Sequence, residues 1–135
     1  MEYEFKQRVF YSDTDAYGVV WHGSYLRWLE MGRIGLCEKA GYSMSKLFED
    51  DITLPVAELN IRYKSPAKLE DELVVVTELK EFSKLSMTFE QRILNAQTGK
   101  LNIIASVKVV AVHNDGNLYR AFPQQMDDFV KKVLK

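Results

Sequence analysis

The densest group of polar and aromatic residues in the sequence lies between Tyr11 and Glu30. Within it, Asp13 and Asp15 are two positions apart, so in an extended backbone their side chains project from one face. Two carboxylates held close together raise the pKa of one of them, and a raised pKa suits a carboxylate that acts as a base. Asp, Thr and Gly also build turns. The spacing therefore leaves two interpretations open, an acid–base site and a simple turn.

Counting positions excludes several other kinds of site in this segment. An EF-hand loop that began at Asp13 would place Tyr17 and Ser24 at its fifth and twelfth positions, where calcium needs carboxylate-type ligands. The two histidines, His22 and His113, have no Cys or His neighbour at the spacing of zinc ligands. No glycine-rich phosphate-binding loop occurs. The sequence therefore gives no support to a calcium, zinc or nucleotide-hydrolysis site.

Charge and cysteine content limit the partners and the compartment. The 135 residues include 18 basic and 19 acidic side chains spread over the whole length, with a net charge of −1. Without a basic block or an acidic tail, nucleic acid and a membrane surface are not supported as partners, although a ligand with local phosphates stays open. The single cysteine, Cys37, rules out an intrachain disulfide and fits a reducing compartment. With no signal peptide and no apolar run near the ~20 residues that span a bilayer, we expect a cytoplasmic protein without membrane insertion.

A long helix must follow the polar segment. Apolar residues recur at three- and four-residue intervals over 24–40, which predicts a helix with Ser24 as N-cap and Gly41 as its C-terminal stop. Gly32 and Gly35 inside it each cost about 1 kcal/mol relative to alanine, so we expect another part of the chain to approach the helix closely there. A short helix over 43–50, capped by Ser43, is predicted next.

The remaining chain has the pattern of a sheet. Alternating or β-branched segments predict strands, and Asn114-Asp115-Gly116 is a hairpin signal. Pro123 opens a final amphipathic helix. Strands grouped after one helix favour an α+β protein with an antiparallel sheet. The predicted strands cover 2–10, 57–63, 72–82, 85–93 and 101–113.

The polar segment resembles a motif of the 4-hydroxybenzoyl-CoA thioesterase family, closest to its bacterial acyl-CoA thioesterase branch. The matching residues run Tyr11-Ser-Asp-Thr-Asp15-Ala-Tyr-Gly18-Val-Val-Trp-His22-Gly-Ser-Tyr25-Leu-Arg-Trp-Leu-Glu30, with further matches at Tyr63-x-x-Pro66-Ala67-x-Leu69-x-Asp71-x-Leu73 and Gln91-Arg92-Ile93. The resemblance implies a single hotdog domain over 1–135, in which a long central helix is wrapped by five or six antiparallel strands. It also implies a homodimer or homotetramer with active sites at the subunit interface, an acyl-CoA substrate, and no cofactor, since CoA is part of the substrate.

The resemblance assigns Asp15 as the catalytic carboxylate, acting as nucleophile or as general base toward water. It places His22 at the entrance of the central helix, where a backbone N–H polarises the thioester carbonyl with help from the helix dipole. The family has Ala or Pro followed by Asn at the next two positions, where this chain has Gly23 and Ser24. Glycine leaves the backbone donors available and lets a carbonyl approach closely.

The remaining expectations concern substrate contacts and packing. Tyr25 is expected to line the acyl pocket or to pack in the core, and Lys84 best matches the family's place for a phosphate contact, ahead of Arg92 and Arg120. Glu30 is expected to be a structural hydrogen-bonding group, and Cys37 a small hydrophobe on the helix.

Two alternatives from other function classes stay open. Hydratases and dehydratases on this fold pair an Asp with a His about five residues later, whereas Asp15 and His22 are seven apart. A non-catalytic acyl-CoA-binding protein is the other alternative, against which the intact Asp-Thr-Asp-x-x-Gly segment argues. The choices between aliphatic and aromatic acyl groups, and between CoA and carrier-protein thioesters, are also open.

Overall fold

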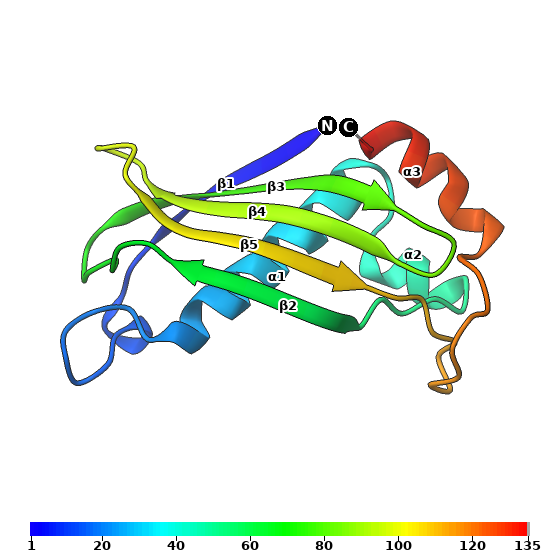
Figure 1. Ribbon diagram of the computed structural model, residues 1–135, viewed down its shortest axis with the longest axis horizontal. Helices are drawn as coiled ribbons and strands as arrows, with labels where there is room; N and C mark the ends of the chain where they lie inside the picture. Colours follow the sequence, from blue (N-terminus) through cyan, green and yellow to red (C-terminus); the bar gives the residue numbers. More distant parts are fainter. Residues whose placement is uncertain (135) are drawn as a thin grey trace.

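One long helix lies against one face of a five-stranded antiparallel sheet in the computed structural model, which describes residues 1–134 (Figure 1). The strand order is β1-β3-β4-β5-β2, so the first and second strands of the chain form the two edges. In chain order the elements are β1 (Glu2–Arg8), the 3₁₀ turn η1 (Tyr11–Asp13), α1 (His22–Lys39), α2 (Met44–Glu49), β2 (Val56–Tyr63), β3 (Glu72–Phe82), β4 (Met87–Asn95), β5 (Leu101–Val109), the 3₁₀ turn η2 (Gln124–Met126) and α3 (Asp127–Val133). This is the hotdog arrangement that the resemblance implied.

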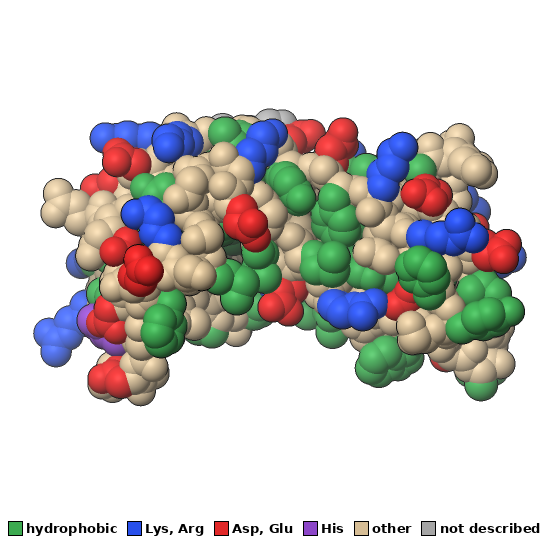
Figure 2. Space-filling view, turned by 180° about the vertical axis from the view of Figure 1, so that it is seen from behind, with side chains coloured by type: hydrophobic (Ala, Val, Ile, Leu, Met, Phe, Trp, Pro, Cys, Tyr) green, Lys and Arg blue, Asp and Glu red, His purple; other side chains and the backbone are tan. Residues whose placement is uncertain are grey.

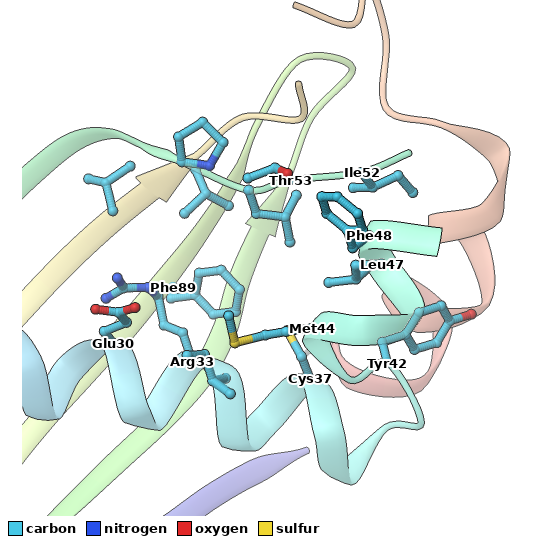
Figure 3. Close-up of a pocket in the computed structure, with 15 residues that line it drawn as sticks. Glu30, Arg33, Cys37, Tyr42, Met44, Leu47, Phe48, Ile52, Thr53 and Phe89 are labelled. Carbon is cyan, nitrogen blue, oxygen red and sulfur yellow. The ribbon is translucent and has the colours of Figure 1, made fainter. Parts of the chain in front are cut away.

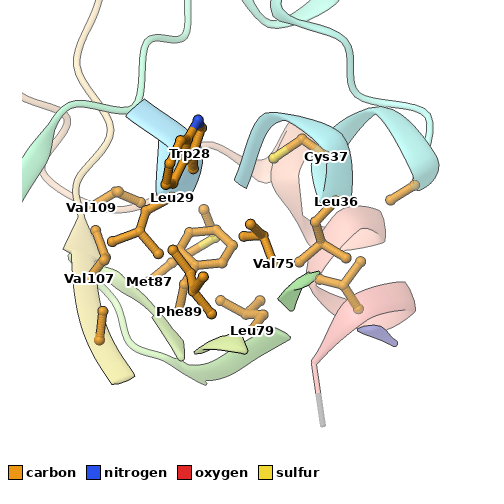
Figure 4. Close-up of a cluster of buried hydrophobic side chains, with 14 of the residues drawn as sticks. Trp28, Leu29, Leu36, Cys37, Val75, Leu79, Met87, Phe89, Val107 and Val109 are labelled. Atoms are coloured by element: carbon orange, nitrogen blue, oxygen red, sulfur yellow. The ribbon is translucent and has the colours of Figure 1, made fainter. Parts of the chain in front are cut away.

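The hydrophobic core fills the space between α1 and the sheet (Figure 4). Trp28 and Leu36 on the helix are fully buried, as are Leu79, Phe89 and Val107 on the strands. Burying a large apolar side chain contributes about 1.5–3 kcal/mol each. Packing against the sheet therefore fixes the position of α1, and with it the end of the segment that leads into the helix.

The two glycines within α1 mark close approaches, as predicted. A Cβ atom at Gly32 would collide with Thr77 Oγ1 and one at Gly35 with the ring of Tyr3. Gln91, at 0% exposure, is the polar centre of the first contact because its Nε2 donates to the Leu29 carbonyl at 2.8 Å and to Thr77 Oγ1 at 2.7 Å. Glycine at position 32 therefore allows α1 to pack directly against the Gln91 side chain.

The ends of the helices follow the predicted signals except at Ser24. Helix α1 begins at His22 with Trp21 as its N-cap, so the prediction of Ser24 as N-cap is wrong. The Ser24 hydroxyl instead donates to the Asp13 carbonyl at 3.0 Å. Gly41 at φ +92° follows the C-terminus of α1, and Ser43 caps α2, as expected.

Two strands are shorter than predicted because the chain turns to other partners. β5 ends at Val109, after which Val112 pairs with Thr53 ahead of β2. β1 ends at Arg8 instead of residue 10. The predicted final helix is confirmed as η2 and α3, beginning after Pro123, with Phe129 among its buried residues.

Strand β2 leaves one edge of the sheet free and carries exposed apolar side chains. Val56, Leu59 and Tyr63 on this strand are each more than two-fifths exposed. A free edge of this kind is a template for pairing with another strand. Among residues 1–134, no helix combines the length and hydrophobicity needed to cross a bilayer.

Candidate active site

Asp15 lies in a short hairpin, residues 13–21, that leads directly into α1. The N–H of Trp21 donates to the Asp13 carbonyl at 2.8 Å, and the turn closes where the N–H of Gly18 donates to the Asp15 carbonyl at 3.0 Å. Gly18 adopts φ +78°, a left-handed conformation that favours glycine. Two residues of extended chain span about 7 Å. Asp15 therefore stands about 7 Å along the hairpin from the backbone pair that begins the helix.

The two aspartates have different surroundings, so the expectation that they project from one face of an extended backbone is wrong. Asp13 closes the 3₁₀ turn η1 and is 2% exposed; its Oδ1 accepts from Arg27 Nη2 at 2.6 Å and its Oδ2 from the N–H of Phe10 at 2.9 Å. Asp15 is half-buried, and its Oδ1 accepts from the N–H of Tyr17 at 2.8 Å. Its Oδ2 accepts no hydrogen bond from the described residues. Asp13 thus anchors the hairpin, and Asp15 keeps an oxygen free for chemistry.

The start of α1, to which the hairpin leads, supplies hydrogen-bond donors without partners. The first N–H groups of a helix have no partner within it, and they carry the positive end of the helix dipole. No side chain caps α1, and the N–H groups of His22 and Gly23 donate to none of residues 1–134. The His22 ring is exposed and packs against Trp21 with centroids 5.2 Å apart. The arrangement combines a free carboxylate oxygen with donors for a developing oxyanion.

The space above Gly23 is covered by the Trp21 ring. A Cβ atom at Gly23 would collide with the six-membered part of that indole, which is itself half-exposed. Glycine is therefore required at this position for the Trp21 side chain to lie where it does. Close approach of a substrate carbonyl to Gly23 stays a prediction, and it requires the Trp21 ring to move aside or to form one wall of the site.

Tyr25 packs inside the protein beneath the hairpin. It is 3% exposed, its hydroxyl accepts from the N–H of Ala67 at 3.1 Å, and its ring lies 5.9 Å from that of Tyr63. Burial raises the pKa of the Tyr25 hydroxyl, so it stays neutral. Tyr25 joins α1 to the end of β2, which is the packing role expected as one alternative; a contact with the acyl group stays a prediction.

One chain does not bring Lys84 and Asp15 together. Lys84 is exposed in the turn between β3 and β4, at the end of the sheet opposite to the hairpin that holds Asp15 (Figure 1). A cation that the sequence did not single out, Lys68, is exposed on the loop beside the hairpin, where its backbone forms a β-bridge with Val19.

A cavity of about 550 Å³ opens along the C-terminal half of α1, between that helix, α2 and the start of β2 (Figure 3). This volume lies within the usual range of small-molecule sites. The Cys37 thiol is part of the wall, and burial raises its pKa to about 12, so it is a neutral hydrophobe as expected. Apolar side chains form most of the remaining wall, among them Ile34, Met44, Leu47, Phe48, Ile52 and Val109.

Glu30 and Arg33 form the polar end of this cavity. Their charged groups lie together at one end of it, away from α2 (Figure 3). Arg33 Nη1 donates to Gln91 Oε1 at 3.0 Å. Burial lowers the pKa of the Arg33 guanidinium, and the neighbouring Glu30 carboxylate partly offsets this effect. The buried amide that required Gly32 therefore also fixes the direction of Arg33.

Comparisons with known proteins agree on one family. The model of the thioesterase-like superfamily matches residues 9–133. The chain belongs to this superfamily. It is 36% identical over 119 residues to the acyl-CoA thioester hydrolase YbgC of Escherichia coli, covering 88% of each chain. Two solved structures at 25% identity are similar: a DHNA-CoA thioesterase from Staphylococcus aureus, with TM-score 0.86 and coverage of 97% of this chain and 90% of that one, and a 4-hydroxybenzoyl CoA thioesterase complexed with 4-hydroxybenzoyl CoA, with TM-score 0.82 and coverage of 92% and 94%.

Membership of the thioesterase-like superfamily confirms the resemblance and the hotdog fold predicted from the sequence. The structure gives roles to residues to which the sequence assigned none. Arg27 holds Asp13, Gln91 holds Arg33, and the cavity wall includes α2. The only local signals for these contacts were the glycine at position 32 and an aspartate two residues before Asp15.

Proposed function

We propose that the chain is an acyl-CoA thioester hydrolase in which Asp15 is the catalytic carboxylate. The observation that carries the proposal is the half-buried Asp15 with a free Oδ2, held on a hairpin that runs directly into unpaired N–H groups at the start of α1. The name of the Escherichia coli relative supports the same reaction class.

Two routes from this geometry give a carboxylic acid and free CoA. In one, Asp15 Oδ2 attacks the thioester carbonyl, CoA leaves as a thiolate that takes up a proton, and water hydrolyses the resulting acyl–aspartate anhydride. In the other, Asp15 removes a proton from a water molecule that attacks the carbonyl carbon; the C–S bond then breaks, and the CoA thiolate takes up that proton. Both routes place negative charge on the carbonyl oxygen, which the N–H groups of His22 and Gly23 would stabilise; one such donor is worth about 100- to 1000-fold in rate. CoA is part of the substrate, and the proposal invokes no cofactor.

A second copy of the chain completes the site in this proposal. The hairpin packs near the Tyr63 end of β2 through Tyr25, whereas the cavity lies at the Val56 end. Symmetric pairing of two free β2 edges is antiparallel, so it places the Val56 end of one copy beside the Tyr63 end of the other. Asp15 of each copy then faces the cavity of its partner, and a homodimer holds two sites.

Lys84 has a place in the proposal only as a residue of another subunit. Because it lies at the far end of the sheet from Asp15, it would contact a CoA phosphate bound at a neighbouring copy's hairpin. Such sharing fits a homodimer or a homotetramer. Sedimentation analysis of Leu59→Asp, which adds a charge to the exposed face of β2, tests the pairing; a change to monomer is expected, together with loss of activity.

Release of free thiol from a panel of aliphatic and aromatic acyl-CoAs tests the reaction. We expect hydrolysis by the wild type, a fall of several orders of magnitude for Asp15→Asn, and full activity for Asp115→Asn, which makes the same chemical change in an exposed turn. A folded protein that binds acyl-CoA without hydrolysing it is instead a binding protein. Water addition to an enoyl-CoA, without thiol release, would make it a hydratase.

A further inference from the structure

The cavity beside α2 has a lining that selects one class of acyl group. We infer that it binds an unbranched aliphatic acyl chain of medium length, with the thioester end near Glu30 and Arg33 and the methyl end against α2. The inference rests on the proposed function, because the thioester must reach Asp15 of the second copy.

The length of the cavity sets the length of the chain. Its α1 wall runs from Glu30 to Cys37, and seven helical residues rise about 10 Å. An extended chain advances about 1.2 Å per bond. The cavity therefore takes about eight carbon atoms before the chain meets α2.

The chemistry of the wall favours hydrocarbon over a hydroxylated ring. Beyond Glu30 and Arg33 the wall is mostly aliphatic, thioether or aromatic, and the Cys37 thiol is neutral. The two hydroxyl groups of the wall already donate elsewhere, that of Tyr42 to the Gln125 carbonyl and that of Thr53 to Asn114 Oδ1, each at 3.3 Å. Hydrophobic side chains also gather along the middle of the helix-side face of the molecule (Figure 2). A ring hydroxyl placed deep in such a cavity loses its hydrogen bonds to water, which costs free energy unless a partner replaces them. Methylene groups carry no such cost.

The polar end sets the direction of the chain. Arg33 is tied to the buried Gln91 amide at 3.0 Å, and the Glu30 carboxylate lies beside its guanidinium (Figure 3). A hydrocarbon end placed here would remove water from two charges, whereas a thioester oxygen and the CoA arm tolerate them. The methyl end therefore points toward α2.

The α2 end is held by contacts independent of the cavity itself. The Phe48 carbonyl accepts from Asn114 Nδ2 at 2.7 Å, and Ser43 caps the start of the helix. Leu47 packs into the core, while the Phe48 side chain is 63% exposed and lines the cavity. Phe48 is thus a specificity-determining residue that can be replaced with little loss of packing.

A chain-length series from butyryl-CoA to palmitoyl-CoA tests this assignment. In the wild type, kcat/KM should rise about fourfold per added CH₂ up to about the octanoyl ester and then level off or fall. Phe48→Ala should lower the ratio of kcat/KM for octanoyl-CoA to that for butyryl-CoA about tenfold. Leu118→Ala, which truncates a side chain of the same 63% exposure outside the cavity, should leave that ratio unchanged. Met44→Ala, also on α2, is the second variant if Phe48→Ala unfolds.

Several results would overturn the assignment. A wild-type kcat/KM that does not change with chain length would do so, as would a higher kcat/KM for benzoyl-CoA than for octanoyl-CoA. An equal loss of kcat/KM on all esters in Phe48→Ala would also do so. Conversion of Phe48→Ala to a monomer would show that the partner chain, and not the acyl group, fills the cavity. If no ester is hydrolysed, the proposed function fails, and calorimetric binding of the same esters then decides: affinity that rises with chain length supports the cavity assignment, and affinity independent of length overturns it.

Discussion

Replacing Asp13 and Asp15 separately by alanine should divide stability from catalysis. Asp13 is buried, and its carboxylate accepts from the N–H of Phe10 and from Arg27. A hydrogen bond to a charged group contributes about 2 kcal/mol. The ion pair is worth about 1 kcal/mol, because the Arg27 side chain is 60% exposed and solvent screens it. Asp13→Ala should therefore lower the free energy of unfolding by about 3 kcal/mol.

Within residues 1–134 the Asp15 carboxylate accepts one hydrogen bond, from the exposed N–H of Tyr17, so Asp15→Ala should cost less than about 1 kcal/mol. Urea unfolding followed by circular dichroism measures both values, and Tm should fall by about 10 °C for Asp13→Ala. Thiol release should collapse in Asp15→Ala while its fold is retained. An Asp15→Ala protein that is destabilised as much as Asp13→Ala would refute the separation of anchoring and catalytic carboxylates.

Three further outcomes follow from the packing. Gly32→Ala should lower the free energy of unfolding by about 2 kcal/mol in urea unfolding, because overpacking outweighs the gain in helix propensity, and Thr77→Ala in the same chain should restore part of it. Iodoacetamide should label Cys37 far more slowly in the folded protein at neutral pH than after unfolding, since burial raises the pKa of the thiol to about 12. Hydrogen bonds from His113 and from the backbone N–H of Asn114 lower the pKa of Asp51 in the folded protein. The contribution of Asp51 to stability is therefore present above its unfolded pKa of about 4 and is lost as the pH falls through the lower folded value. In Asp51→Asn, the urea midpoint of unfolding should depend less steeply on pH in the acid range.

Signals carried within a few residues predicted the fold well. Gly41 and Ser43 mark helix ends through backbone conformation and a side chain three residues away. The glycine at position 32 predicted a close approach to α1, but it did not identify Gln91 as a residue that makes it. The predicted N-cap at Ser24 is wrong because α1 begins two residues earlier, at His22; Ser24 lies in the first turn, where its hydroxyl donates to the Asp13 carbonyl eleven residues back.

The site depended more heavily on contacts that no local pattern encodes. The motif identified Asp15 and the helix entrance, but the role of Asp13 is decided by Arg27, fourteen residues further on. Residues of α1, α2, β2, β4 and β5 line the cavity, so its shape exists only after the sheet has formed. β5 ends early because Val112 pairs with Thr53, and these two residues are far apart in the sequence.

In the proposed dimer, the two ends of one chain contribute to different active sites. The hairpin offers a carboxylate and unpaired N–H groups, with the Trp21 ring over Gly23 and a buried Tyr25 beside it. The far end offers an apolar cavity with the charged groups of Glu30 and Arg33 at one end and a neutral Cys37 thiol in its wall. Antiparallel pairing of two β2 edges, whose apolar side chains are exposed, brings these opposite ends together. Leu59→Asp should therefore abolish hydrolysis without altering Asp15 or the cavity wall, and mixing Asp15→Asn subunits with subunits whose cavity is blocked should restore one working site per dimer.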